Sequence, residues 1–472
     1  MTRKAPSRPV IPIRPTAGEV ANAGDADDGV HFVSLYQKQP DIYPRAVKGW
    51  FARWRWTFVW LTQLLFYGLP WIGWNDRQAV LFDLGARRFY LFGLVLWPQD
   101  ALLLAIALIL AATGLFLVTA LAGRLFCGFA CPQTVYTSIF MWVETRVEGD
   151  HLARLRLDQA PLGPRKLGLK AAKHGLWLLF AGWTGITFVG YFTPIRELLP
   201  ALAGWNVGPW EGFWVLFYAL FTYLQAGFAR EAVCQHMCPY SRFQGVMFDA
   251  TTRTVSYDAT RGEPRKGKGG GDCIDCGICV QVCPTGIDIR DGLQYPCINC
   301  GLCVDACDEV MTRVAKPLGL IRFASEQELA GMPRRGGRPR LAVYGGLIGV
   351  FVALGAWTAT QRSLLLVDVL RDRGSLAREA ADGRIENAYT LKLANLAEMP
   401  RDFEVEVSGL PGIELVGTRR FAGEAGSIRA VQVTVAAPAD GGPSGARPIT
   451  FQVRAADDPS TRVTEKSTFV LP

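Results

Sequence analysis

The chain has 472 residues, of which half are hydrophobic, and it carries a net charge of +8 with 14 Trp and 12 Cys. Its apolar residues are concentrated in a few long stretches, which excludes a protein that is soluble throughout. The composition therefore predicts a membrane protein with soluble parts, and we expect no nucleic-acid partner.

The first part of the chain, residues 1–50, is expected to form a cytoplasmic N-terminal tail. Residues 1–30 are rich in Pro, Gly, Ala and Asp and are expected to be partly disordered. The first twenty residues contain basic side chains but no apolar core, so we expect no cleavable signal peptide.

The long apolar stretches predict a five-helix α transmembrane bundle, because ~20 apolar residues cross a bilayer core. The expected spans are Trp56–Asn75, Ala101–Gly123, Gly175–Ile195, Gly212–Ala229 and Leu341–Thr360. The first four lie in a domain of residues 51–255, and the fifth lies with its linker in residues 331–363. A further run at 89–99 is too short to span and is expected to be re-entrant or interfacial.

The orientation of these helices is predicted from the basic residues near their ends. Lys and Arg flank the first helix on its N-terminal side, separate the second from the third and precede the fifth. Because cytoplasmic segments carry the excess of Lys and Arg, these segments are expected on the cytoplasmic side of a bacterial inner membrane. Residues 364–472 would then lie in the periplasm.

Two cysteine runs predict a 2x[4Fe-4S] ferredoxin-like α+β module in the cytoplasm, at residues 256–330. The segments 273–283 and 297–307 each have the spacing Cys-x2-Cys-x2-Cys-x3-Cys, and Pro284 follows the first run. In two-cluster ferredoxins the fourth cysteine of each run binds the cluster of the other run. The predicted ligand sets are Cys273, Cys276, Cys279 and Cys307, and Cys297, Cys300, Cys303 and Cys283. A pair of zinc sites is the alternative.

Two further cysteine pairs follow apolar runs, as "CGFACP" and "CQHMCP". The offset along the chain from Cys127 to Cys234 is the same as that from Cys131 to Cys238. This constant offset indicates an internal duplication of a helix and a turn. On a helical turn the two cysteines of a pair would share one face, and the proline that follows suits the start of a new helix.

The four cysteines of these turns are interpreted as one soft-ligand site. Thiolates select copper(I), zinc or iron–sulfur clusters, and His236 and Met237 in the second turn complete a ligand set that copper(I) accepts. Cysteines that only pack helix ends are the alternative. The residues leave open whether the thiols bind a metal, cycle as a disulfide or hold a further cluster.

Residues 364–472 alternate apolar and polar residues between Pro/Gly turns, without Cys or His. This pattern predicts a β-sandwich of the immunoglobulin type. It is expected to be a docking domain for a periplasmic partner or a plain folded cap.

With these motifs in this order, and with "CIDCGICVQVCP" and "CINCGLCVDAC", the chain resembles the cytochrome c oxidase accessory family known as FixG, RdxA or CcoG. The resemblance implies an iron–sulfur protein needed to assemble the cbb-type oxidase, which reduces copper(II) to copper(I). Copper would then be bound or reduced by Cys127, Cys131, Cys234 and Cys238, assisted by His236 and Met237.

The implied activity is that of an oxidoreductase of the cupric reductase type. The expected partners are membrane lipid, the cbb-type oxidase or copper chaperones, and a cytoplasmic electron donor. The donor is not identified, because the sequence has no Gly-x-Gly-x-x-Gly turn after a strand and so no nicotinamide domain. A quinone-linked electron conduit and a structural assembly factor are the alternative functions.

Overall fold

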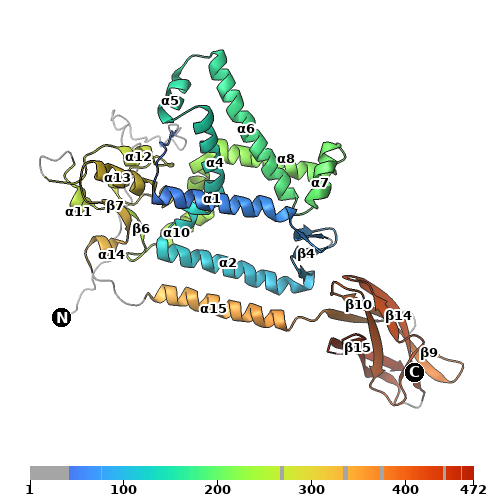
Figure 1. Cartoon of the computed structure of the whole chain (residues 1–472). Coiled ribbons are helices and arrows are strands. Elements are labelled where there is room, and N and C mark those ends of the chain that lie inside the picture. The colour runs from blue at the N-terminus through green and yellow to red at the C-terminus, as the bar shows by residue number, and fades with distance from the viewer. Residues whose placement is uncertain are drawn as a thin grey trace, which may run out of the picture. The chain divides into compact units, whose positions relative to one another are not determined.

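The computed structural model describes residues 42–75, 77–265, 270–332, 338–372, 377–439, 443–458 and 460–472. The chain divides into two compact units, Met1–Val352 and Ala353–Pro472. The expectation of disorder in residues 1–30 lies outside the described residues. Figure 1 labels many of the elements of both units.

Long helices occupy all five of the predicted spanning regions. They are α1 (Trp50–Gly68), α2 (Ala101–Ala122), α6 (Pro164–Val189), α8 (Pro209–Leu224) and α15 (Pro339–Thr360). Within the described residues, three helical segments are long and apolar enough to cross a membrane: Pro98–Ala122, Pro209–Met237 and Pro339–Thr360. The chain is therefore a membrane protein. Because α1 and α6 also carry basic residues, a bundle of five spanning helices stays a prediction.

The connection between α1 and α2 is a small β-structure, which bears on two expectations. Helix α1 ends at Gly68 and is followed by a 3-10 turn, Leu69–Trp71, that contains Pro70, so the stretch predicted to span up to Asn75 is not α-helical throughout. The run at 89–99, expected to be re-entrant or interfacial, is not a helical segment, and its place relative to the membrane stays a prediction. It forms the hairpin β4 (Arg88–Leu91) and β5 (Leu94–Leu96), which extends β3 (Val80–Asp83) into a three-stranded antiparallel sheet.

The ferredoxin module lies in the first unit and is closed by two strands. Strand β6 (Thr254–Tyr257) pairs antiparallel with β7 (Ile321–Ala324). Helix α12 (Ile278–Gln281) lies within the first cysteine run, and α13 (Leu302–Arg313) begins within the second. A buried apolar cluster that includes Val255, Ile289, Met311 and Leu320 packs this module.

The module is attached to the start of α1. The carboxylate of Asp305 on α13 accepts hydrogen bonds from the backbone N–H groups of Phe51 (3.2 Å) and Ala52 (2.7 Å). A carboxylate at a helix N-terminus satisfies free N–H groups and complements the helix dipole. Phe51 also stacks on Phe323 of β7, with ring centroids 5.1 Å apart. The ferredoxin module, with its cluster-binding loops, is therefore held at the N-terminal end of α1.

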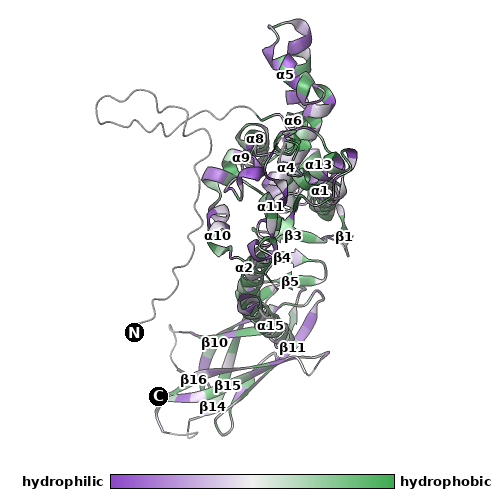
Figure 2. Ribbon diagram, turned by 90° about the vertical axis from the view of Figure 1, so that its left-hand side faces the viewer, coloured by the Kyte–Doolittle hydropathy of each residue, from purple (hydrophilic) through white to green (hydrophobic). Residues whose placement is uncertain are grey.

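The second unit contains two antiparallel sheets, as predicted for an immunoglobulin-like sandwich. One sheet has the order β12 (Glu414–Val416), β14 (Ile428–Pro438), β10 (Arg384–Asn395) and β8 (Leu365–Arg371), with β9 (Arg378–Glu379) also on β10. The other has β13 (Arg420–Gly423), β11 (Arg401–Ser408), β15 (Gly445–Ala455) and β16 (Arg462–Leu471). Their inner faces bury Tyr389, Phe403, Phe451 and Phe469. Hydropathy alternates along these strands, whereas α5 (His151–Gln159) in the first unit is largely hydrophilic (Figure 2).

Candidate redox site

The two cysteine runs of the ferredoxin module fold into the same kind of loop. Gly277 and Gly301 have left-handed backbone angles, with φ of 66° and 74°, and each directly precedes the helix that carries the third cysteine of its run. Glycine adopts this conformation without the steric cost that a side chain would bring. The repeated sequence spacing thus becomes a repeated backbone geometry.

The cysteines of these loops line two cavities. We call the cavity lined by Cys273, Cys276, Cys279 and Cys307 the outer cluster site, because Cys276 is exposed. We call the cavity lined by Cys283, Cys297, Cys300 and Cys303 the inner cluster site; Cys279 also touches it. This is the grouping that the crossed ferredoxin pattern predicts.

The chemistry of the two cavities fits iron–sulfur clusters better than single metal ions. Burial raises the pKa of Cys279 to about 11 and that of Cys297 to about 12, so both need a strongly positive group nearby to become thiolates. Among the described His, Cys, Asp and Glu residues, no three lie close enough to hold one metal ion. A cubane places its ligands further apart than one zinc ion does.

Serine variants of the fourth cysteines test the crossed grouping. We expect Cys283→Ser to disturb the cluster bound by the second run, although Cys283 belongs to the first run, and Cys307→Ser to disturb the other cluster. EPR spectra of the reduced proteins, compared with those of Cys300→Ser and Cys276→Ser, give the measurement. If Cys283→Ser matched Cys276→Ser instead, the grouping would be wrong.

The two Cys-x3-Cys-Pro turns share a hydrogen-bond pattern, as expected of a duplication. In the first turn, the N–H of Cys131 bonds to the carbonyl of Phe126 (2.9 Å), and the Thr134 hydroxyl donates to the carbonyl of Cys127 (2.5 Å). In the second turn, the N–H of Cys238 bonds to Val233 (2.9 Å), and the Ser241 hydroxyl donates to Cys234 (2.6 Å). Both hydrogen bonds of the first turn recur in the second turn between the same atoms, with each residue number shifted by the offset that also separates the cysteines.

The geometry within each turn differs from the expected helical one. Cys131 and Cys238 are extended residues that precede α4 (Pro132–Val147) and α10 (Pro239–Met247), with ψ of 129° and 109°. The proline that follows excludes the helical conformation at the preceding residue. Proline starts the next helix in both turns, as predicted, and the placement of both sulfurs of a pair on one face stays a prediction.

Polar contacts join the two turns to each other. The Cys127 thiol donates to Oε1 of Gln244 (3.3 Å) on α10, and burial together with the neighbouring Cys131 raises the pKa of Cys127 to about 11. The Gln133 side chain on α4 donates to the carbonyls of Gln225 and Arg230, both at 3.0 Å. These contacts place both cysteine pairs in one region of the protein.

The structure does not assemble the expected copper ligands around one point. His236 and Met237 are exposed, Met237 to 64%, while all four turn cysteines are partly buried. In the described part of the two turns, no three His, Cys, Asp or Glu side chains lie close enough to hold one metal ion. Copper binding there stays a prediction.

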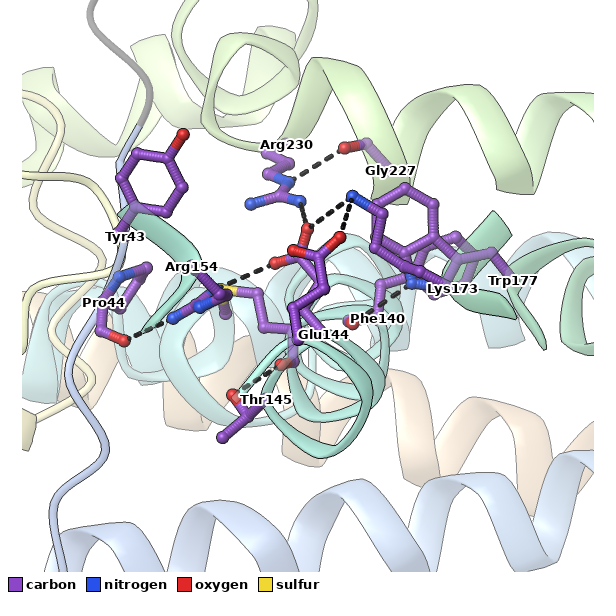
Figure 3. A network of polar contacts seen from close by, with 12 residues as sticks. Tyr43, Pro44, Phe140, Glu144, Thr145, Arg154, Lys173, Trp177, Gly227 and Arg230 are labelled. Carbon is purple, nitrogen blue, oxygen red and sulfur yellow. Dashed lines mark hydrogen bonds and ion pairs between the residues drawn. The ribbon is translucent and has the colours of Figure 1, made fainter. Parts of the chain in front are cut away.

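A buried ion-pair network next to the second turn was not predicted from the sequence. Glu144 on α4 pairs with Arg154 of α5 (3.0 Å), with Lys173 of α6 (3.7 Å) and with Arg230 just before the second turn (2.6 Å). Figure 3 shows these three cations directed toward Glu144. The sequence feature that could have indicated this network is Glu144 itself, the single acidic residue of α4.

Family models match three parts of the chain. The model of the Ig-like fold at the C-terminus of FixG covers residues 355–472. A 4Fe-4S dicluster domain matches residues 229–269 and 263–326, and a 4Fe-4S binding domain matches residues 104–149. The last match contains Cys127 and Cys131, and the stretch 229–269 contains Cys234 and Cys238. These matches support iron–sulfur clusters and the immunoglobulin-like second unit.

Relatives of similar length match most of the chain. The nitrogen fixation protein FixG of Rhizobium meliloti is 36% identical over 451 residues, covering 85% of each chain. The chain belongs to the family of FixG, RdxA and RdxB. RdxB of Cereibacter sphaeroides is 41% identical over 401 residues, covering 79% of this chain and 83% of its own. The solved structure of a FixG-related protein from Vibrio parahaemolyticus is 24% identical and covers 23% of this chain and 97% of its own, with a TM-score of 0.21.

Proposed function

We propose that this member of the FixG family carries electrons from a cytoplasmic donor through two [4Fe-4S] clusters to the paired turns, where copper(II) is reduced to copper(I). One electron leaves a reduced cluster and one copper(II) ion takes it up. The copper(I) would be delivered for assembly of a cbb-type oxidase, directly or through a copper chaperone. In this proposal five helices span the inner membrane, with the ferredoxin module on the cytoplasmic side and residues 364–472 on the periplasmic side.

The proposal is supported above all by the packing of the first turn on the inner cluster site. A Cβ added to Gly128, between Cys127 and Cys131, would lie 2.7 Å from the carbonyl oxygen of Ile298 and 2.9 Å from the Cα of Cys300. The backbone of the turn is thus in contact with a cluster-binding loop. Electrons leaving this cluster would reach the turn thiols over a short path, and soft thiols stabilise copper(I) over copper(II).

The double variant Cys234→Ser/Cys238→Ser tests this function. We expect it to lose nearly all copper(II) reduction, because serine oxygens are poor ligands for copper(I), while both cluster EPR signals remain. The assay follows copper(I) formation by purified, dithionite-reduced protein. Ala232→Ser, which adds the same hydroxyl to this turn without removing a thiol, is the matched control and should behave like the wild type.

Undiminished copper(II) reduction by the double variant would contradict the proposal. Loss of both cluster signals would show that these cysteines support the fold. His236→Ala and Met237→Leu then separate the roles of the exposed side chains. We expect a partial loss if they assist copper binding.

A second candidate for the turns is a further iron–sulfur cluster. It is favoured by the 4Fe-4S matches at residues 104–149 and 229–269, each of which contains one of the cysteine pairs. This candidate predicts more iron per chain than two [4Fe-4S] clusters contain, and a loss of that excess in Cys234→Ser/Cys238→Ser. Iron and copper analysis of the purified protein distinguishes the two.

A further inference from the structure

We infer that the cluster of the inner site is the one from which electrons leave for the turns, and that Arg124 is the positioning residue that couples this cluster to both turns. The direction of electron flow rests on the proposed function. The coupling of Arg124 to the inner site rests on contacts in the first unit alone.

The first observation is that the inner site, unlike the outer one, is built against the first turn. The contact of Gly128 with Ile298 and Cys300 leaves no space for a side chain between the turn and the inner site. Cys276 of the outer site is exposed instead, and is thus accessible to a soluble donor. Electron tunnelling slows steeply with distance, so the order from donor to acceptor is outer site, inner site and turns.

The second observation is the position of Arg124, which immediately precedes the first turn. Its guanidinium donates to the carbonyl of Ser241 beside the second turn (2.8 Å) and to the carbonyls of Tyr295 and Cys297 at the inner site, the latter at 3.4 Å. The cation also lies over the ring of Tyr295, 4.7 Å from its centroid. One side chain, which belongs to the residue just before the first turn, therefore contacts the second turn and the loop of the inner cluster.

The charge of Arg124 is buried and forms no ion pair with an acidic side chain among the described residues; its guanidinium donates to carbonyl groups and lies over an aromatic ring. The residue is 5% exposed, and its Nε has no hydrogen-bond partner within the described structure. A reduced cluster carries one more negative charge than an oxidised one. A buried cation beside the cluster stabilises the reduced form, because low polarity strengthens the attraction.

A second link connects the same elements. The hydroxyl groups of Ser241 and Tyr295 are 2.7 Å apart, and the Ser241 hydroxyl also donates to the carbonyls of Cys234 and Cys238. Tyr295 thus reaches the second turn through Ser241 and the first turn through Arg124. Redox titration of the inner cluster should therefore respond to changes at Arg124.

Arg124→Gln tests the inference through redox titration of the two cluster EPR signals, without copper. We expect the ratio of reduced to oxidised cluster to fall about tenfold for one cluster at a fixed potential, which corresponds to a potential lower by ~59 mV for one electron. That cluster should be the one whose signal is altered by Cys300→Ser. Arg124→Lys, which keeps the charge, should titrate close to the wild type.

Arg290→Gln is the matched control at the outer site. Arg290 lines that cavity and pairs with Asp275 and Asp288, both at 2.6 Å. Arg290→Gln should shift the reduction potential of only one cluster, the one whose EPR signal is altered by Cys276→Ser. The inference is overturned if Arg124→Gln shifts the reduction potential of the outer cluster alone, of both clusters equally, or of neither cluster.

The order of the clusters is tested by mixing reduced protein with copper(II) and freezing samples at successive times. The inner signal should disappear first in the wild type, and more slowly in Arg124→Gln. If the outer signal disappears first, the inner cluster is not the exit. If copper(II) oxidises neither cluster, the proposed function fails, whereas the titration still decides whether Arg124 acts on the inner cluster.

Tyr295→Phe, which removes only the hydroxyl contact with Ser241, provides a milder variant should Arg124→Gln fold poorly.

Discussion

Replacing Glu144 by glutamine is expected to lower the free energy of unfolding of the first unit by about 3–5 kcal/mol, which is the usual cost of breaking a buried ion pair. Glu144 is 5% exposed and Arg154 is 2% exposed, so neither charge is solvated by water. The variant leaves Arg154, Lys173 and Arg230 facing a neutral amide. Among the residues that the structure describes, Lys173 alone of the three keeps a second carboxylate nearby, that of Glu148 at 3.1 Å.

The consequences of this variant should extend to the second turn. Arg230 has a φ of 35°, a conformation that side chains rarely adopt, and it lies shortly before Cys234. Its guanidinium is held by Glu144 and by the carbonyl of Gly227 (2.9 Å). Without Glu144, one of the contacts that hold this strained residue is lost. We therefore expect slower copper(II) reduction in addition to lower stability.

Thermal denaturation of the purified protein in detergent, followed by the loss of cluster absorbance, measures the effect. Glu309→Gln is the control, because Glu309 pairs with Arg313 on the exposed side of α13, with 48% and 66% of the two side chains accessible. Such surface pairs contribute about 0.3–0.5 kcal/mol. Similar small losses in both variants would show that the Glu144 network does not stabilise the protein.

Replacing Gly128 by alanine is expected to destabilise the junction between the first turn and the inner cluster site by about 1–3 kcal/mol, as overpacking of a filled interior does. Gly128 lies in the short helix α3 (Leu125–Phe129), where alanine would otherwise be preferred by about 1 kcal/mol. The new Cβ would approach the backbone of Ile298 and Cys300 within 3 Å. Backbone atoms cannot move aside as a flexible side chain can, so the clash outweighs the helix preference.

The matched control is Gly114→Ala in α2, where no other atom lies within 4 Å of the new Cβ. That variant should leave stability unchanged or raise it by up to about 1 kcal/mol. Gly128→Ala should in addition alter the EPR signal of the inner cluster and leave that of the outer cluster unchanged. If Gly128→Ala were as stable as Gly114→Ala, the turn and the inner site would not be in close contact.

Much of the architecture follows from local patterns in the sequence. Cysteine spacing predicts the two cluster loops, because three thiolates at short intervals fit one cubane and glycine permits the turn between them. Apolar runs predict helices in all five regions, and period-two alternation predicts the sandwich. These patterns succeed because each depends on neighbours along the chain. At 89–99 the apolar run was too short to indicate a secondary structure by itself, and it forms a hairpin.

The turns show where local reasoning ends. The sequence determines that the two cysteine pairs recur at a constant offset and that a proline follows each pair. It does not determine that Gly128 contacts Cys300, that Arg124 bridges both turns and the inner site, or that Glu144 gathers three cations. Most of those partners are distant from one another along the chain, and only packing brings them together. A charged residue has the same sequence signature whether it faces water or a buried ion, so the tertiary structure alone decided which charges shape the redox site.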